Sequence, residues 1–144
     1  MNDTSILQPT VALMIWTMVM WAWMYVTRIP AMSKLNVAPN DAAMPRSLDE
    51  TLPANVQAKA HNYNHLHEQP TVFYATAIIL ALTGQGHDMN TLLAWIYVGL
   101  RVAHSLVQVT ANVVMVRFVL FALSSVVLIV LIFHTAVQVF DIHL

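Results

Sequence analysis

The fold of this chain is decided by residues 11–27, VALMIWTMVMWAWMYVT, an uncharged run. With its flanks this run is long enough to cross a hydrocarbon core about 30 Å thick. Only Asp3 carries a charge before it, whereas a secretory signal has Lys or Arg in that place. We therefore expect the segment to be retained as a membrane helix over about residues 9–28.

The composition of the whole chain extends this conclusion. Of its 144 residues, 58% are apolar and 9% are charged, whereas about 25% are charged in an ordinary soluble domain. So few charges cannot cover a water-soluble protein, which predicts an integral membrane protein in contact with a lipid bilayer. The net charge of −1 excludes a nucleic-acid partner, because there is no basic surface for phosphates. The chain has no cysteine, so thiol chemistry would need a thiol from the substrate.

The next two segments differ in polarity. Residues 29–51 are rich in proline and charge, so we expect an extramembrane loop there. Ser47 and Glu50 have the spacing of a helix-capping box, and a second helix is expected over about residues 52–84. The first half of this helix is polar and the second half is apolar, and Pro70 between them predicts a kink.

Two more spans complete the predicted fold. Apolar runs indicate membrane helices over about residues 91–111 and 115–141, joined by a short link. Short links make successive helices antiparallel. We therefore expect residues 1–144 to form one domain, an all-α integral membrane protein built as an up-and-down bundle of four transmembrane helices.

Lys and Arg are distributed unevenly along the chain. Those on the side of the first loop are Arg28, Lys34, Arg46, Lys59 and Arg117. The positive-inside rule places this side in the cytosol and both termini away from it. We therefore expect a multi-pass protein, in the inner or plasma membrane if the source is bacterial.

One face of the second helix carries a polar stripe. Its members, at spacing i, i+3, i+4 and i+7, are His61, Asn64, His65 and Glu68. This spacing stacks the four side chains on one face. The stripe is either a wetted surface just outside the bilayer or the wall of a ligand site.

Polar residues also interrupt the third span and begin the fourth. Arg101 and His104 lie one turn apart within the third span, where an unpaired ionisable group costs at least about 2.5 kcal/mol. Glu68 is the one acidic residue near such a depth, so we expect a Glu68–Arg101 ion pair between helices. Together with Gln108 and Arg117, these groups predict a cytosolic site for an anionic ligand. An Arg beside a thiol would favour its thiolate.

These residues resemble a known family. Residues 60–70, AHNYNHLHEQP, and the Phe-Tyr-Ala that follows at 73–75 are similar to the second-helix signature of the MAPEG family, the membrane-associated proteins in eicosanoid and glutathione metabolism. The Arg-Val-Ala-His at 101–104 and Arg117 resemble the third and fourth helices of the same family. The resemblance implies a homotrimer of four-helix subunits that binds glutathione between neighbours, facing the cytosol. It also implies conjugation, peroxidase or isomerase chemistry on a lipophilic small-molecule substrate.

The resemblance further implies a role for each site residue. Arg117 matches the arginine that stabilises the thiolate, and it would be the catalytic residue. The expected glutathione-binding positions, with Arg28 coming from a neighbouring subunit, are Arg28, His61, Asn64, His65, Glu68, Arg101, His104 and Gln108.

Three positions depart from the family pattern. The family has Arg and Asn where this chain has His61 and His65, and Tyr where it has Gln108. Asn64 is adjacent to the missing Asn and could take its role after a small rotation. Gln108 can hydrogen-bond a ligand, but it cannot supply a phenol.

Other functions fit parts of the pattern. A divergent or non-catalytic member of the same fold could bind another anionic ligand, or serve as an accessory subunit. A haem or metal site would use His61, His65 and His104. Two histidines one turn apart on one helix compete for the same side of one iron, so no metal ligands are predicted. A small transporter would need paired discontinuous helices and an inverted repeat, which the sequence lacks.

Overall fold

The structure is a computed structural model that describes residues 4–42 and 45–142, and every regular element in these ranges is helical. The elements in chain order are α1 (Leu7–Lys34), the 3-10 helix η1 (Pro39–Ala42), α2 (Pro45–Thr51), α3 (Ala54–His65), α4 (Gln69–Leu82), α5 (Asp88–Val109) and α6 (Val114–Val139). Asp3 and the side chains of Arg46 and Ser47, which entered the sequence arguments, lie outside the described part.

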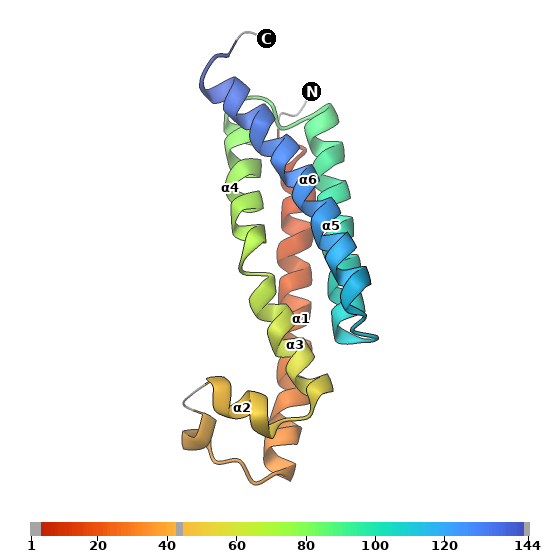
Figure 1. Cartoon of the computed structure of the whole chain (residues 1–144). Helices are drawn as coiled ribbons and strands as arrows, with labels where there is room; N and C mark the ends of the chain where they lie inside the picture. The colour runs from red at the N-terminus through yellow and green to blue at the C-terminus, as the bar shows by residue number, and fades with distance from the viewer. Residues whose placement is uncertain (1–3, 43–44, 143–144) are drawn as a thin grey trace.

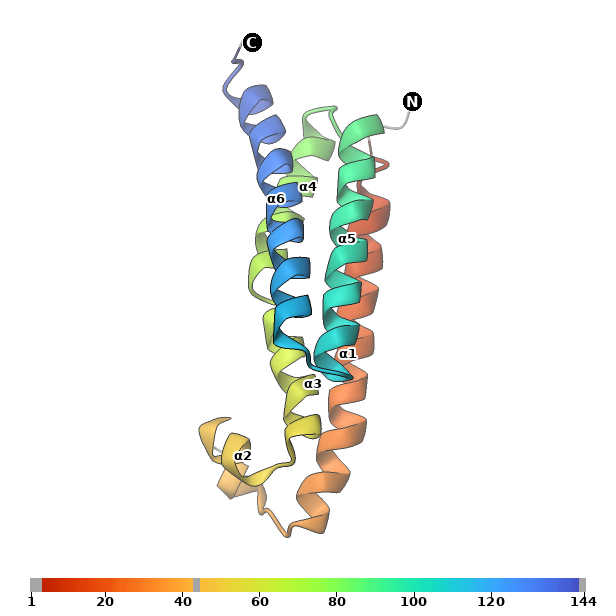
Figure 2. The same ribbon diagram turned by 45° about the vertical axis from the view of Figure 1, so that its right-hand side comes forward.

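The long helices form an elongated bundle (Figure 1). α1 and α6 both run along α5, and α3 continued by α4 forms another column beside α1, as the turned view in Figure 2 also shows. α1 packs against α3, α4 and α5, and α6 packs against α4 and α5. The start of α1 and the end of α6 lie at one end of the bundle, and α2 lies at the other (Figure 1).

Three of the described helices are long and apolar enough to cross a membrane. They are α1, α5 and α6, with 28, 22 and 26 residues. α4 has 14 residues, which is about 21 Å of helix and too short to span the bilayer core alone. The expected bundle of four complete transmembrane helices is therefore seen as three long helices and one interrupted column.

α1 is longer than the sequence predicted. It was expected to end near residue 28, but it continues through Pro30 to Lys34. Pro30 removes one backbone donor and leaves the carbonyl of Val26 without its helical partner. Both residues are exposed, so water or lipid headgroups can solvate that carbonyl. The helix ends only where Asn36 takes the left-handed conformation, with φ 52°.

The expected second helix over residues 52–84 is divided in two. α3 ends at His65 and α4 begins at Gln69, which confirms an interruption near Pro70. Because proline has no N–H, the carbonyl of Leu66 has no partner four residues on. Part of the expected loop at residues 29–51 is also helical, since it contains the end of α1, η1 and α2.

The apolar core lies between the inward faces of α1, α4, α5 and α6. Leu13, Met20 and Leu80 are completely buried, and Phe73 stacks on Tyr97 with ring centroids 4.4 Å apart. The outer faces of α1 and α6 carry many exposed large apolar side chains. Such surfaces are unusual on a soluble monomer and suit contact with lipid.

Candidate functional site

The break between α3 and α4 forms one wall of the site. Within its own segment, the carbonyl of His65, the last residue of α3, receives only a long contact of 3.4 Å from the N–H of Glu68. From α5 it accepts a hydrogen bond of 3.2 Å from Nη2 of Arg101. The interruption therefore frees a carbonyl group, and Arg101 caps it.

The expected ion pair between Glu68 and Arg101 is wrong for the described chain. The Arg101 side chain is completely buried, whereas the Glu68 side chain is 66% exposed. Oε2 of Glu68 accepts a hydrogen bond of 2.7 Å from Nδ1 of His65. Glu68 lies in the turn after α3, with φ −90° and ψ −101°, so it no longer continues the face of that helix. The guanidinium group takes a backbone carbonyl as its partner instead.

A cavity of about 250 Å³ lies where the end of α3, the second half of α5 and the start of α6 meet. Its lining residues are His65, His104, Val114, Arg117, Phe118 and Phe121. The rings of His65 and His104 lie with their centroids 4.9 Å apart. The guanidinium of Arg101 lies 5.6 Å from the centre of the Phe121 ring. The fold thus brings three predicted site residues, His65, His104 and Arg117, into one cavity.

Arg117 is positioned by the short link between α5 and α6. Asn112 in this link has a left-handed backbone, with φ 49°, and its Oδ1 accepts a hydrogen bond of 2.7 Å from Nη1 of Arg117. Nε of Arg117 is buried and has no hydrogen-bond partner in the described chain. One nitrogen of the guanidinium is therefore anchored, and another is left for a ligand or an ordered water.

α5 turns a polar face towards the interior. The members of this face, all buried, are Arg101, His104, Ser105 and Gln108. Among the described residues there is no hydrogen-bond partner for Nε and Nη1 of Arg101, Oγ of Ser105 or Oε1 of Gln108. Each buried polar group without a partner costs about 1–3 kcal/mol. This donor and acceptor set therefore suits a polar ligand or ordered water.

The polar stripe of the second helix points mainly outward. His61 and Asn64 are exposed, and Nε2 of His61 lies 3.0 Å from Oδ1 of Asp49 on α2. Neither residue lines the cavity around Arg117. Asn62, which was not predicted as a site residue, is completely buried, and its side-chain oxygen and nitrogen both lack a partner in the described chain.

Arg28 lies in α1, at the end of the bundle near α2. It is half-buried and lines a pocket of about 10 Å³ together with Asp49, Gln57 and neighbouring residues. The Gln57 amide donates to the carbonyls of Asp49 and Leu52, which ties α3 to α2. This pocket is too small for an organic ligand, so a binding role for Arg28 would need a second subunit.

A hydrogen-bond chain that the sequence reasoning missed joins α5, α4 and α6. The hydroxyl of Tyr97 donates to Oε1 of Gln69 at 3.4 Å, and Nε2 of Gln69 donates to Oγ of Ser125 at 2.8 Å. Tyr97 lies four residues before Arg101, one turn along the same buried face of α5. This spacing was the signal that could have identified it.

Comparison with models of known protein families gives a match. The model of a family described as the MAPEG family matches residues 6–137, which includes α1 to α5 and nearly all of α6. No curated protein and no solved structure gave a significant match to the chain. The family match and the three apolar helices together indicate a multi-pass membrane protein.

Proposed function

Because the chain belongs to the MAPEG family, we propose that it is a membrane-bound protein of the glutathione transferase type. It would activate the thiol of glutathione for conjugation to lipophilic substrates or for reduction of lipophilic peroxides. The observation that supports this proposal most strongly is the cavity in which Arg117 meets His65 and His104 beside two phenylalanines. A cation and two imidazoles next to apolar rings suit an anionic sulfur with a lipophilic partner.

Arg117 is the proposed catalytic residue. Glutathione supplies a thiol, and its thiolate is the nucleophile. A free thiol has a pKa near 8.5, so most of it is protonated at neutral pH. Lowering the pKa by about two units needs roughly 2.7 kcal/mol of preferential stabilisation of the thiolate. The half-buried Arg117, whose Nε has no partner in the described chain, is suited to provide this stabilisation.

The buried polar face of α5 would hold the rest of the tripeptide. Arg101 has two nitrogens without partners, which can donate to a carboxylate. Gln108 offers an amide in place of the phenol that the family has at this position. His104 lines the same cavity as Arg117 and would contact the ligand beside it.

We propose that a homotrimer completes the site. The cavity of about 250 Å³ in the single chain is smaller than the roughly 300–1,000 Å³ of typical ligand pockets. The exposed side chains of His61, Asn64 and Glu68 would face a neighbouring subunit, and Arg28 would reach the ligand from that neighbour. In this arrangement the column of α3 and α4 is the second of four spans, the site faces the cytosol, and both termini lie on the opposite side.

Thermal unfolding with and without glutathione tests this proposal. A ligand at one hundred times its dissociation constant adds about 2.7 kcal/mol to the free energy of unfolding. We expect a saturable rise in the melting temperature of the detergent-purified protein, and a smaller rise for Arg117→Ala. Lys34→Ala, which removes a cation at the far end of α1, is the matched control and should keep the full rise.

Two results would contradict the proposal. One is the absence of any shift at millimolar glutathione. The other is an Arg117→Ala variant that conjugates a lipophilic electrophile as fast as the parent protein.

A divergent MAPEG protein that binds another anion is the alternative proposal. It draws on His61 and Gln108, which replace the family's Arg and Tyr, and it would give a thermal shift with a different anion only. The haem alternative has less support from the geometry. The rings of His65 and His104 are tilted by 45° with their centroids 4.9 Å apart. This is too close for an iron between them with bonds of about 2 Å to a nitrogen of each ring. No cluster of three metal-ligating residues occurs in the described ranges.

A further inference from the structure

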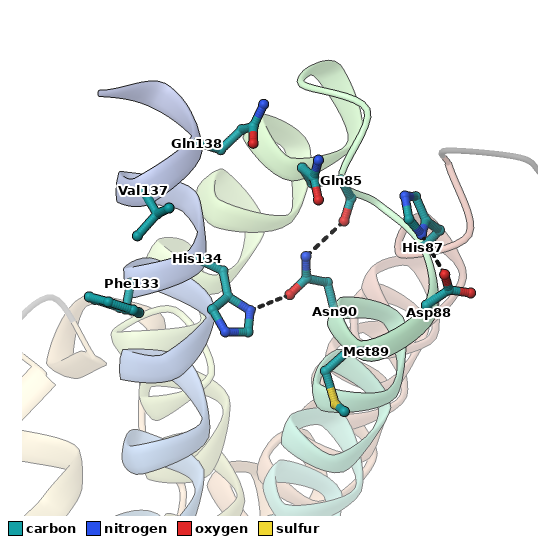
Figure 3. A pocket seen from close by; sticks show the side chains of 9 residues that line it. All are labelled: Gln85, His87, Asp88, Met89, Asn90, Phe133, His134, Val137 and Gln138. Atoms are coloured by element: carbon teal, nitrogen blue, oxygen red, sulfur yellow. Dashed lines mark hydrogen bonds and ion pairs between the residues drawn. The ribbon is translucent and has the colours of Figure 1, made fainter. Parts of the chain in front are cut away.

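A second cavity, of about 420 Å³, lies near the end of the bundle where α1 starts and α6 ends. It lies between the first turn of α5 and the last turns of α6, beside the turn that follows α4 (Figure 3). His134 on α6 lines this cavity, and the helical rise from Arg117 to His134 is about 25 Å. The cavity is therefore separate from the site around Arg117, and we refer to it as the His134 cavity.

Hydrogen bonds fix the polar groups of the His134 cavity (Figure 3). Nδ2 of Asn90 donates to the carbonyl of Gln85 at 2.9 Å, so Oδ1 of Asn90 faces Nδ1 of His134, at 2.6 Å. An amide oxygen only accepts, so Nδ1 of His134 carries a proton. In the neutral imidazole, Nε2 then holds a lone pair. Because His134 lines the cavity, this lone pair is the acceptor that its ring can offer to a donor there.

The charge around the His134 cavity favours a cation. The sequence has no Lys or Arg between residues 60 and 100, nor after residue 117. Asp88 lines the cavity, with its side chain 65% exposed, and its Oδ2 accepts a hydrogen bond of 2.9 Å from His87. The carbonyls of the last turn of α6 add partial negative charge to the cavity. The start of α5 carries partial positive charge from its helix dipole, and the carboxylate of Asp88 offsets it. Among the described residues that line the cavity, an anion would meet no Lys or Arg.

The His134 cavity also lies where a lipid can reach it. α6 has 26 residues, about 39 Å, which exceeds a hydrocarbon core of about 30 Å. Its last turns therefore extend towards the headgroup layer. Met89 and Phe133 line the cavity and are 59% and 54% exposed. The polar groups of the cavity thus lie next to exposed apolar side chains, which is the pattern of an amphipathic ligand.

We propose that the His134 cavity binds the headgroup of a phospholipid with a primary ammonium group, of the phosphatidylethanolamine type. An N–H of the ammonium would donate to Nε2 of His134, and Asp88 would balance its charge. The acyl chains would lie against Met89 and Phe133. A trimethylated headgroup has no N–H to donate, and an anionic headgroup would be repelled. This inference does not depend on the proposed glutathione chemistry.

Native mass spectrometry of the full chain in detergent tests this assignment. The protein is mixed with phosphatidylethanolamine, phosphatidylcholine and phosphatidylglycerol of identical acyl chains, and the retained lipid is counted. One hydrogen bond from a charged donor corresponds to roughly tenfold in affinity. We expect about tenfold more phosphatidylethanolamine than either other lipid.

Matched variants assign the binding to the cavity. His134→Phe keeps a ring but removes the lone pair, and it should abolish the preference. His67→Phe changes an exposed histidine in the turn after α3, away from this cavity, and should keep it. Asp88→Asn alters an exposed side chain with little risk to folding, and it should weaken the preference as well.

Three results would overturn the proposal. They are equal retention of the three lipids, a preference for phosphatidylglycerol, and a preference for phosphatidylethanolamine that survives in a folded His134→Phe or Asp88→Asn variant. Circular dichroism establishes that each variant is folded before its lipids are counted.

Discussion

Arg101 is the residue at which the structure makes its sharpest energetic prediction. Its side chain is completely buried, yet it makes a single hydrogen bond, to the His65 carbonyl, and two of its nitrogens have no partner in the described chain. Replacing Arg101 by Met, which has similar length, leaves that carbonyl with only the long contact from the Glu68 N–H, which costs up to about 1–3 kcal/mol. The same change removes a hydrogen bond from a charged donor, worth about 1.5–3 kcal/mol. It also removes two orphaned nitrogens, each costing about 1–3 kcal/mol.

These terms nearly cancel in the unliganded protein. We expect Arg101→Met to change the free energy of unfolding by less than about 2 kcal/mol, whereas breaking a buried ion pair costs about 3–5 kcal/mol. Glu68→Gln should have an even smaller effect, about 0–1 kcal/mol, because the Glu68 carboxylate pairs with His65 at an exposed position. The stabilisation by glutathione should decrease strongly in Arg101→Met, since the unpartnered nitrogens are the proposed carboxylate donors.

Circular dichroism during unfolding in mixed micelles measures the free energy of unfolding of both variants under the same conditions. Leu100→Met, a conservative change at the residue that precedes Arg101 in α5, serves as a control for general effects of substitution in this helix. Losses above about 3 kcal/mol for both Arg101→Met and Glu68→Gln would refute the reasoning, because they would show a buried ion pair between the two residues.

Three further substitutions test the packing. Asn62→Leu should raise the free energy of unfolding by about 1–3 kcal/mol, because it removes two buried polar atoms that have no partners in the described chain. A lower melting temperature would show that Asn62 has a partner in the assembled protein. Gln69→Leu should lower the free energy of unfolding by about 1–2 kcal/mol, since it breaks the chain from Tyr97 to Ser125; unchanged denaturant unfolding would contradict this. Gly99→Ala should stabilise α5 by up to about 1 kcal/mol, because an added Cβ meets nothing within 4 Å. Destabilisation in a thermal scan would show that a neighbouring subunit packs against Gly99.

The sequence predicted the features that follow from local chemistry. Low charge and long apolar runs indicated four membrane helices. The described structure contains three of them as long apolar helices, with ends shifted by a few residues in α5 and α6. Pro70 predicted a kink because proline lacks an N–H, and the structure instead has a break just before it, between α3 and α4. Arg101 and His104 were predicted to lie one turn apart within the third span, and both are buried on one face of α5 together with Gln108.

The features that depended on tertiary contacts were not predictable in the same way. The helix break frees the His65 carbonyl, and the packing of α5 against α3 brings Arg101 to this carbonyl. The partner of Arg101 is therefore the His65 carbonyl and not the Glu68 carboxylate. α1 was expected to end near residue 28, but it continues through Pro30, whose exposed position tolerates the missing hydrogen bond. The spacing of the polar stripe was visible in the sequence, but which flank of α3 is buried depends on its neighbours, and Asn62 rather than Asn64 faces inward.

The central claim is that Arg117 stabilises a thiolate in the cavity it shares with His65 and His104. Ultraviolet difference titration of glutathione bound to the full chain measures this directly, because a thiolate absorbs where a thiol does not. We predict that bound glutathione titrates about two pH units below the value near 8.5 of a free thiol, and that Arg117→Leu abolishes this shift. A bound thiol that titrates near 8.5 in the parent protein, or an unchanged shift in Arg117→Leu, would contradict the account.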